Sequence, residues 1–230
     1  MISDRLARIQ AEITRICSQL QRNPDEITLV GVTKFAAPQA VVDAVRAGLK
    51  HIGENKLQSA REKFAQLEPA GLHVTKHMIG HLQTNKVKKA LAVFDMIQSV
   101  DSLKLAREIE KEAAKISRAA DILVQVNTSG EEQKFGLSPG EAVPLLREIE
   151  GLPHVAVKGL MTIAPLTSDE AVIRGAFART REIFEDLKQQ YSGHDRIKMK
   201  YLSMGMSNDY RIALEEGANM LRIGSAIFGE

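Results

Sequence analysis

Residues 29–48, LVGVTKFAAPQAVVDAVRAG, contain one complete strand–helix unit, and this unit sets the interpretation of the rest of the chain. The apolar run over 27–33 is typical of a buried strand. After a short turn containing proline, the periodicity predicts a helix over 38–47 that ends at Gly48. Lys34 stands where the strand leaves the core. It is either a solvated strand-end lysine or an amine held ready for a carbonyl ligand.

The same alternation continues along the chain, after an amphipathic helix expected over residues 3–21. Further strands are predicted over 51–53, 76–79, 94–100, 122–126, 155–163, 200–204 and 220–223, with helices over 56–67, 85–91, 102–119, 140–150, 169–190 and 209–216. Alternating strands and helices imply parallel strands joined by crossover helices. Eight such units in about 200 residues predict a closed (β/α)8 TIM barrel with an extra N-terminal helix.

The main competing architecture is a doubly wound open sheet. No G-x-G-x-x-G follows the first strand, where Gly31 stands alone, and this disfavours a dinucleotide-binding sheet. The sequence also shows no linker, low-complexity tract or long charge run. We therefore expect one domain over residues 1–230.

Composition limits the class of protein and its compartment. Hydrophobic residues make up 44% and charged residues 26%, and the net charge of +2 favours neither nucleic acid nor an anionic membrane as partner. A single Cys17 fits a reducing compartment, and we expect it to pack inertly. Without an apolar leader or a long apolar run, we expect a cytoplasmic protein with no membrane contact.

Function in such a barrel sits at the carboxyl ends of the strands, and two of these ends suggest an anion site. The last strand ends in Gly224-Ser225, where a short turn of helix can begin. The preceding strand ends in SMGMSND (203–209), which adds hydroxyls and a glycine. Backbone N–H groups exposed there attract phosphate. The alternative is that Gly-Ser is merely a common turn.

Side chains alternate between the two faces of a strand, and this alternation directs two cations towards this end of the barrel. Arg222 alternates with outward-facing apolar neighbours, so its guanidinium should point into the barrel. It is either ion-paired to a carboxylate or in contact with a ligand. Lys34 shares a strand face with Val30 and Val32 and should project into the mouth. A free amine beside a phosphate site suggests a Schiff base with a phosphorylated aldehyde or ketone, such as pyridoxal phosphate or a sugar phosphate.

Weaker patterns remain open. His77 and His81 are four residues apart in HMIGH, which is not a metalloprotease motif and spans a strand end. The basic run over 85–89 is typical of a solvated helix face. The polar loop over 127–139 is either a lid with Lys134 reaching into the mouth or a mobile surface loop.

Several longer segments resemble one known family. They are LVGVTK (29–34), HIGENKLQ (51–58), HMIGHLQTNK (77–86), QVNTSGEEQKFGL (125–137), GLMTI (159–163) and SMGMSNDYRIALEEGANMLRIGSAIFG (203–229). In this order they resemble the pyridoxal phosphate homeostasis protein family (the YggS or PROSC type), which is related to the N-terminal barrel of alanine racemase. The match covers nearly the whole chain. Thr33, where the family often has Ser, is a mild departure.

The resemblance implies roles for individual residues. Lys34 matches the lysine that holds pyridoxal 5′-phosphate as a Schiff base. Arg222 matches the arginine that faces the pyridine nitrogen, and Asn55 matches a residue that lines the cofactor. The remaining matches are the phosphate-holding Ser203, Gly224 and Ser225, and Met78 and Met161, which fall near the ring.

The resemblance also bears on activity. The related racemase carries a second domain and a second-face tyrosine, whereas this chain ends at Glu230 and its three tyrosines offer no obvious counterpart. Racemisation needs an acid or base on each face of the substrate carbon. We therefore expect a non-catalytic carrier that works in pyridoxal phosphate (vitamin B6) homeostasis, with indirect effects on amino-acid and keto-acid metabolism. A small pyridoxal phosphate-dependent enzyme, such as an amino-acid racemase, is the alternative, and a Schiff-base lyase is more distant. We expect a monomer whose partners are pyridoxal phosphate and apo-enzymes that require it.

Overall fold

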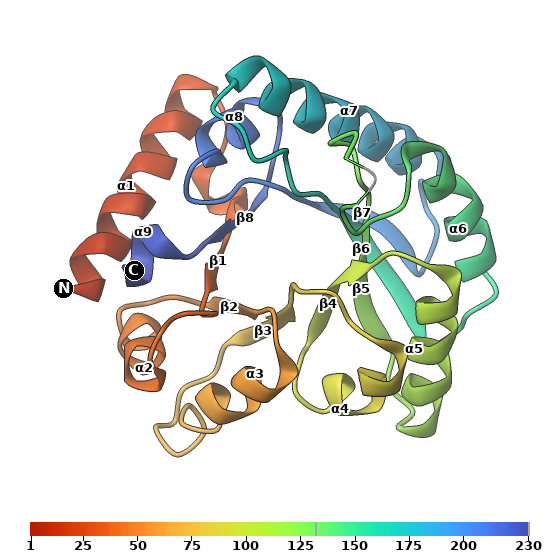
Figure 1. Cartoon of the computed structure of the whole chain (residues 1–230), viewed down its shortest axis with the longest axis horizontal. Coiled ribbons are helices and arrows are strands. Elements are labelled where there is room, and N and C mark those ends of the chain that lie inside the picture. Colours follow the sequence, from red (N-terminus) through yellow and green to blue (C-terminus); the bar gives the residue numbers. More distant parts are fainter. Residues whose placement is uncertain (132, 230) are drawn as a thin grey trace.

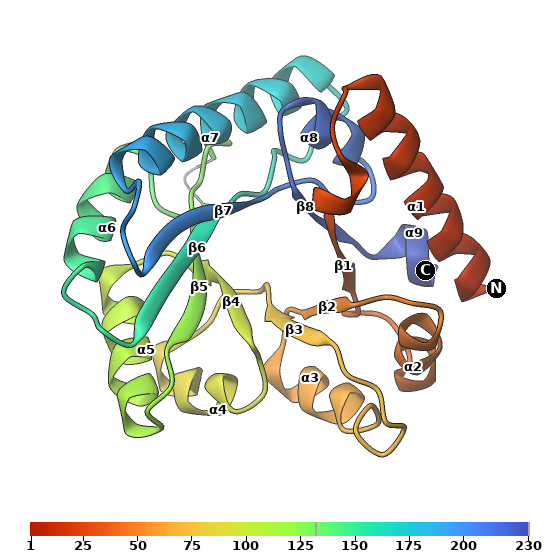
Figure 2. The same cartoon turned by 180° about the vertical axis from the view of Figure 1, so that it is seen from behind.

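The strands close into a barrel surrounded by helices, as the alternation predicts. The computed structural model describes residues 1–131 and 133–229, so the predicted loop over 127–139 is described apart from residue 132. Within these ranges eight parallel strands pair in chain order, and the last strand pairs with the first. Figure 1 and Figure 2 show the ring of helices around the sheet from its two ends.

The strands are short, and their bounds agree closely with the apolar runs. They are β1 (Thr28–Val32), β2 (His51–Glu54), β3 (Thr75–Met78), β4 (Met96–Val100), β5 (Ala120–Gln125), β6 (Val155–Met161), β7 (Ile197–Ser203) and β8 (Met220–Ile223). The largest difference from prediction is β7, which begins three residues early. Its first residues alternate buried Ile197 and Met199 with exposed Lys198 and Lys200, which is the period-two pattern of a strand.

A helix follows each strand. The helices are α1 (Ile2–Gln19), α2 (Pro38–Arg46), α3 (Leu57–Phe64), α4 (Val87–Leu91), α5 (Leu103–Lys115), α6 (Ala142–Ile149), α7 (Glu170–Gln190), α8 (Tyr210–Glu215) and α9 (Ser225–Phe228). Short 3₁₀ turns stand before β1 (η1, Pro24–Glu26), α4 (η2, Thr84–Lys86) and α6 (η3, Pro139–Glu141). The helices bury their apolar faces against the outside of the barrel.

The extra helix α1 covers the outside of the barrel where it closes. Its apolar stripe is buried, and Cys17 lies fully inside, as expected for inert packing. Figure 1 shows α1 running beside α8 and α9, with α9 close to the start of α1. Among the residues described, we find no helix whose length and hydropathy would suit a membrane span.

The barrel interior holds its own small apolar cluster. Val30, Met96, Leu123, Met161 and Met220 form this cluster, separate from the large outer core. Met220 and Arg222 therefore share the inward face of β8, because successive side chains of a strand point to opposite sides. Buried polar side chains, among them His77, Gln98 and Ser203, also lie in the interior, and they build the site.

Candidate functional site

The rim residues predicted from sequence lie on four neighbouring strands. β1, which precedes Lys34, pairs with β2 on one side and with β8 on the other. β8 in turn pairs with β7, so the ends that carry Asn55, Lys34, Arg222 and Ser203 are consecutive in the sheet. Because all strands are parallel, their carboxyl ends meet at one rim. Barrel closure thus brings residues 34 and 222 onto adjacent strands.

Arg222 lies inside the barrel and is only 4% exposed. Its Nη1 donates to the Ser203 hydroxyl and its Nη2 donates to the Thr162 carbonyl, each at 2.7 Å. Within the described chain it has no carboxylate at ion-pair distance. Burial lowers the pKa of Arg222 to about 10, and nearby Asp209 acts in the opposite direction. The guanidinium therefore stays charged at neutral pH with only neutral partners, which disfavours the ion-pair alternative.

A chain of hydrogen bonds runs from Arg222 through the barrel. The Ser203 hydroxyl donates to Gln98 Oε1 (2.7 Å), and Gln98 Nε2 lies 3.0 Å from His77 Nδ1. His77 Nε2 lies 3.1 Å from Nδ1 of His51, the first residue of β2. The chain thus links the rim to the amino-terminal end of the barrel. It places the Ser203 hydroxyl beneath Arg222 and not in the phosphate cup expected from sequence, because parity turns this side chain inward.

The cup contains a different serine. The Ser207 hydroxyl accepts from the backbone N–H groups of Gly224 (3.3 Å) and Ala226 (3.5 Å). Gly205, with φ of 94°, turns the chain after β7 and so carries Ser207 over the end of β8. Residue 207 lies within the SMGMSND segment, but its spacing alone did not distinguish it from Ser203. The cup presents backbone N–H groups and a hydroxyl, the donors that bind phosphate.

Lys34 combines an anchored backbone with an exposed side chain. The preceding Thr33 donates its N–H (2.9 Å) and its hydroxyl (3.2 Å) to the Gly53 carbonyl. The Thr33 carbonyl accepts from Lys63 Nζ at 2.5 Å. The Lys34 ammonium lies 4.5 Å from the ring centre of the exposed Phe35. The strand end is thus held in place while the amine remains accessible to a ligand.

Glu54 anchors both strand ends, a role that the sequence did not assign to it. Its carboxylate is fully buried and accepts from Lys63 Nζ (2.6 Å) and the Ser59 hydroxyl (2.9 Å) through Oε1. Its Oε2 accepts from the backbone N–H groups of Asn55 (2.8 Å) and Lys56 (3.3 Å). The partner lysine lies on α3, on a face that sequence periodicity did not distinguish from a solvated one. This buried pair positions the backbone that carries Asn55.

The loop after β5 reaches across to the end of β3. Phe135 stacks on His81, with ring centres 4.1 Å apart. Lys134 pairs with Glu131 and donates to the Ala164 carbonyl at 3.2 Å. Lys134 is thus engaged within its own side of the rim, and Phe135 makes the contact across the mouth.

Other sequence patterns separate in space. His77 is buried in the barrel, whereas His81 is exposed at the rim, 3.5 Å from an Asp101 carboxylate oxygen. Tyr191 caps the far end of α7, and the Tyr210 hydroxyl donates to Glu12 on α1. The Tyr210 hydroxyl is thus engaged on the outside of the barrel, and Tyr191 lies at the C-terminal end of its helix.

The donor set fits pyridoxal phosphate. A phosphate would meet N–H groups and hydroxyls at the cup of Ser207, Gly224 and Ser225. A ring nitrogen, which is an acceptor, would suit Arg222, whose Nε makes no hydrogen bond among the described residues. An aldehyde would suit the accessible amine of Lys34. All three groups belong to one rim.

Comparison with known proteins gives consistent matches along the chain. The family model for the alanine racemase N-terminal domain matches residues 5–230. Pyridoxal phosphate homeostasis proteins of Aquifex aeolicus and Haemophilus influenzae are 37% and 36% identical, over 99% of this chain and 97% and 95% of their own lengths.

Solved structures match the fold. PipY of Synechococcus elongatus, solved with PLP bound, has a TM-score of 0.84 at 33% identity and 100% coverage of both chains. Alanine racemase of Clostridium difficile has a TM-score of 0.74 at 15% identity, covering 97% of this chain and 56% of that one. The racemase match extends to the fold alone.

Proposed function

Because the chain belongs to the pyridoxal phosphate homeostasis proteins, within the alanine racemase N-terminal domain family, we propose that it binds pyridoxal 5′-phosphate and acts in the homeostasis of this cofactor. One observation carries the proposal most directly. Arg222 is a buried cation whose hydrogen-bond partners among the described residues are all neutral, on the strand next to the one that presents Lys34. A buried charge of this kind is stabilised by a ligand with a complementary acceptor.

Each residue has a defined part in binding. Ser207, Gly224 and Ser225 hold the phosphate, and Arg222 donates to the ring nitrogen. Lys34 supplies the amine, and Asn55 lines the ring edge. When bound, the cofactor supplies an aldehyde that condenses with a primary amine and releases water. The hydrogen-bond chain beneath Arg222 holds the guanidinium in place, which keeps the site preorganised.

The same residues favour holding over turnover. Arg222 can only donate, so the ring nitrogen facing it stays unprotonated and the ring withdraws electrons weakly. Tyr191 lies at the C-terminal end of α7, and the Tyr210 hydroxyl is engaged by Glu12 of α1 on the outside of the barrel, so neither is placed as a second-face base. We therefore propose a carrier, with residues 1–230 forming one binding domain that works as a monomer in the cytoplasm and supplies apo-enzymes.

Absorbance and borohydride trapping test the proposal. The purified protein should be yellow, or become yellow on adding pyridoxal phosphate, and reduction should leave a pyridoxyl group that peptide mass spectrometry finds on Lys34. The Lys34→Ala variant should lose the band, whereas Lys88→Ala, which removes an exposed lysine on α4, should keep it. A colourless protein that takes up no cofactor would overturn binding. Robust racemisation of an amino acid would overturn the carrier role.

A further inference from the structure

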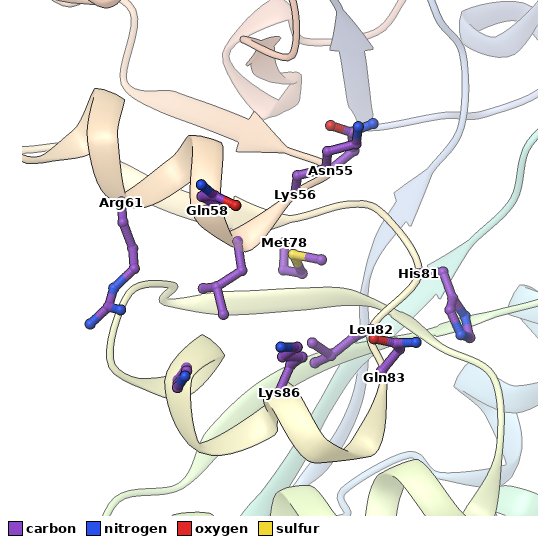
Figure 3. Close-up of a pocket in the computed structure, with 11 residues that line it drawn as sticks. Asn55, Lys56, Gln58, Arg61, Met78, His81, Leu82, Gln83 and Lys86 are labelled. Atoms are coloured by element: carbon purple, nitrogen blue, oxygen red, sulfur yellow. The ribbon is translucent and has the colours of Figure 1, made fainter.

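A second cavity opens beside the rim, between α3 and the η2–α4 segment. Its volume is about 580 Å³, within the range of about 300–1,000 Å³ that is usual for small-molecule sites. Figure 3 shows Asn55 and Lys56 on one side of the cavity, Gln83 and Lys86 on the other, and Met78 between them. The full lining is Asn55, Lys56, Leu57, Gln58, Arg61, Met78, His81, Leu82, Gln83, Lys86 and Lys89.

This cavity is distinct from the cofactor site. Lys34, Arg222, Ser207 and the Gly224–Ser225 cup make no part of its wall. The two sites adjoin at the end of β2, where Asn55, proposed above to line the cofactor ring, also belongs to the cavity wall. A ligand in the cavity would therefore sit next to the cofactor site without occupying it.

The cavity wall carries an unbalanced positive charge. Lys56, Arg61, Lys86 and Lys89 supply four cations, and no Asp or Glu lines the wall. In the part of the chain that the structure describes, none of the four has an ion-pair partner, although thirteen ion pairs of lysine, arginine or the N-terminus with a carboxylate occur elsewhere. Like charges held this close repel one another, so an anion placed among them is attracted by all four.

The helix geometry concentrates this charge on the cavity. Lys86 and Lys89 are three residues apart and so share one face of the η2–α4 segment, whereas the adjacent Lys88 is outside the lining. Lys56 and Arg61 approach from the opposite side, from the start and the second turn of α3. The cations thus come from two elements that face each other across the cavity.

The rest of the wall suits an organic ligand. The half-buried Leu57 gives the wall an apolar surface, and the almost fully buried Met78 and Leu82 form an apolar floor beneath it. The amides of Gln58 and Gln83 add donors and acceptors at the edges. An inorganic ion alone would leave the apolar surface in contact with water.

We propose that this cavity is a second site, which binds a small organic phosphate ester with its phosphate among the four cations and its apolar part on Leu57, Met78 and Leu82. Phosphate monoesters carry nearly two negative charges at neutral pH, which matches several lysines better than a single carboxylate does. The inference rests on the proposed function only for the choice of probe, because a phosphorylated ring is the ligand class of the neighbouring site.

Calorimetric titration of the cofactor-loaded, borohydride-reduced protein with pyridoxine 5′-phosphate tests the second site. Reduction fixes the first site covalently, so the heat measured reports on another location. One equivalent should bind, and Lys86→Ala combined with Lys89→Ala should weaken binding by about tenfold or more. Lys88→Ala removes the same charge from the same helix outside the cavity and should have little effect.

Two further ligands distinguish binding of the phosphate group from binding of the organic part. Unphosphorylated pyridoxine and inorganic phosphate should each bind more weakly than the ester. Absence of binding, equal weakening by Lys88→Ala, or inorganic phosphate binding as tightly as the ester would each overturn the inference. Failure of the cofactor proposal appears separately, as an absent pyridoxyl adduct. In that case the same titration of Lys34→Ala protein, with and without the paired lysine substitutions, still tests the cavity.

Discussion

The buried histidine in the hydrogen-bond chain should make folding sensitive to mild acid. His77 is 1% exposed, and burial lowers its pKa from 6.5 to about 3, with a smaller contribution from His51. The hydrogen-bond chain also requires that the imidazole ring of His77 be neutral. The Gln98 amide uses its oxygen to accept from Ser203, so its nitrogen donates to His77 Nδ1, which cannot then carry a proton.

The sign and size follow from linkage. Between pH 6.5 and about pH 3 the unfolded chain binds a proton at residue 77 that the folded chain does not, so stability falls as pH falls. The slope is about 1.4 kcal/mol per pH unit, and the loss between pH 7 and pH 5 is about 2 kcal/mol. Burial also lowers the pKa of His51, which adds a loss in the same direction.

Urea unfolding followed by circular dichroism at pH 7 and pH 5 measures this loss. The His77→Gln variant cannot take up the proton, so its stability should fall by about 2 kcal/mol less than that of the parent protein over this interval. His73→Gln, which removes an exposed histidine that takes no part in the hydrogen-bond chain, is the matched control. Because each protein is compared with itself at two pH values, general destabilisation by the substitution cancels. An equal fall in the parent and His77→Gln would refute the assignment.

Four further substitutions test separate parts of the structure. Glu54→Gln leaves the buried Lys63 ammonium without its carboxylate, and the free energy of unfolding in urea should fall by about 3–5 kcal/mol. Ser207→Ala should weaken pyridoxal phosphate binding by about tenfold in an absorbance titration with little change in thermal stability, since the residue is only half-buried. Gly159→Ala should cost about 3 kcal/mol or more in urea unfolding, because φ is 146° and the new Cβ would fall 1.9 Å from the Tyr201 carbonyl oxygen. Gly175 lies in open space on α7, so Gly175→Ala should instead raise the free energy of unfolding by about 0.5–1 kcal/mol. Changes of the same sign at these two glycines would contradict this reasoning.

The sequence by itself determined the architecture and the direction of the key side chains. Apolar runs and amphipathic helices are local patterns, so each strand and helix can be recognised from its own residues without knowing which elements it packs against. Parity is equally local, so the inward direction of Arg222 could be predicted from its apolar neighbours alone. The β7 start was missed because its lysines alternate with the apolar residues and hide the run.

Only the tertiary structure decided which of these side chains meet. Pairing of β8 with β1 sets residue 222 beside Val30, and no local pattern specifies that pairing or its register. Register shifts in three strand pairs, between β4 and β5, β5 and β6, and β6 and β7, displace the interior polar residues relative to a regular sheet. Closure of the barrel places Ser203 of β7 beneath Arg222 of the adjacent β8, and it joins Ser203 to Gln98 of β4 across the interior. Contacts across a barrel depend on closure and register, which are properties of all eight strands together, and so they cannot be read from any one segment.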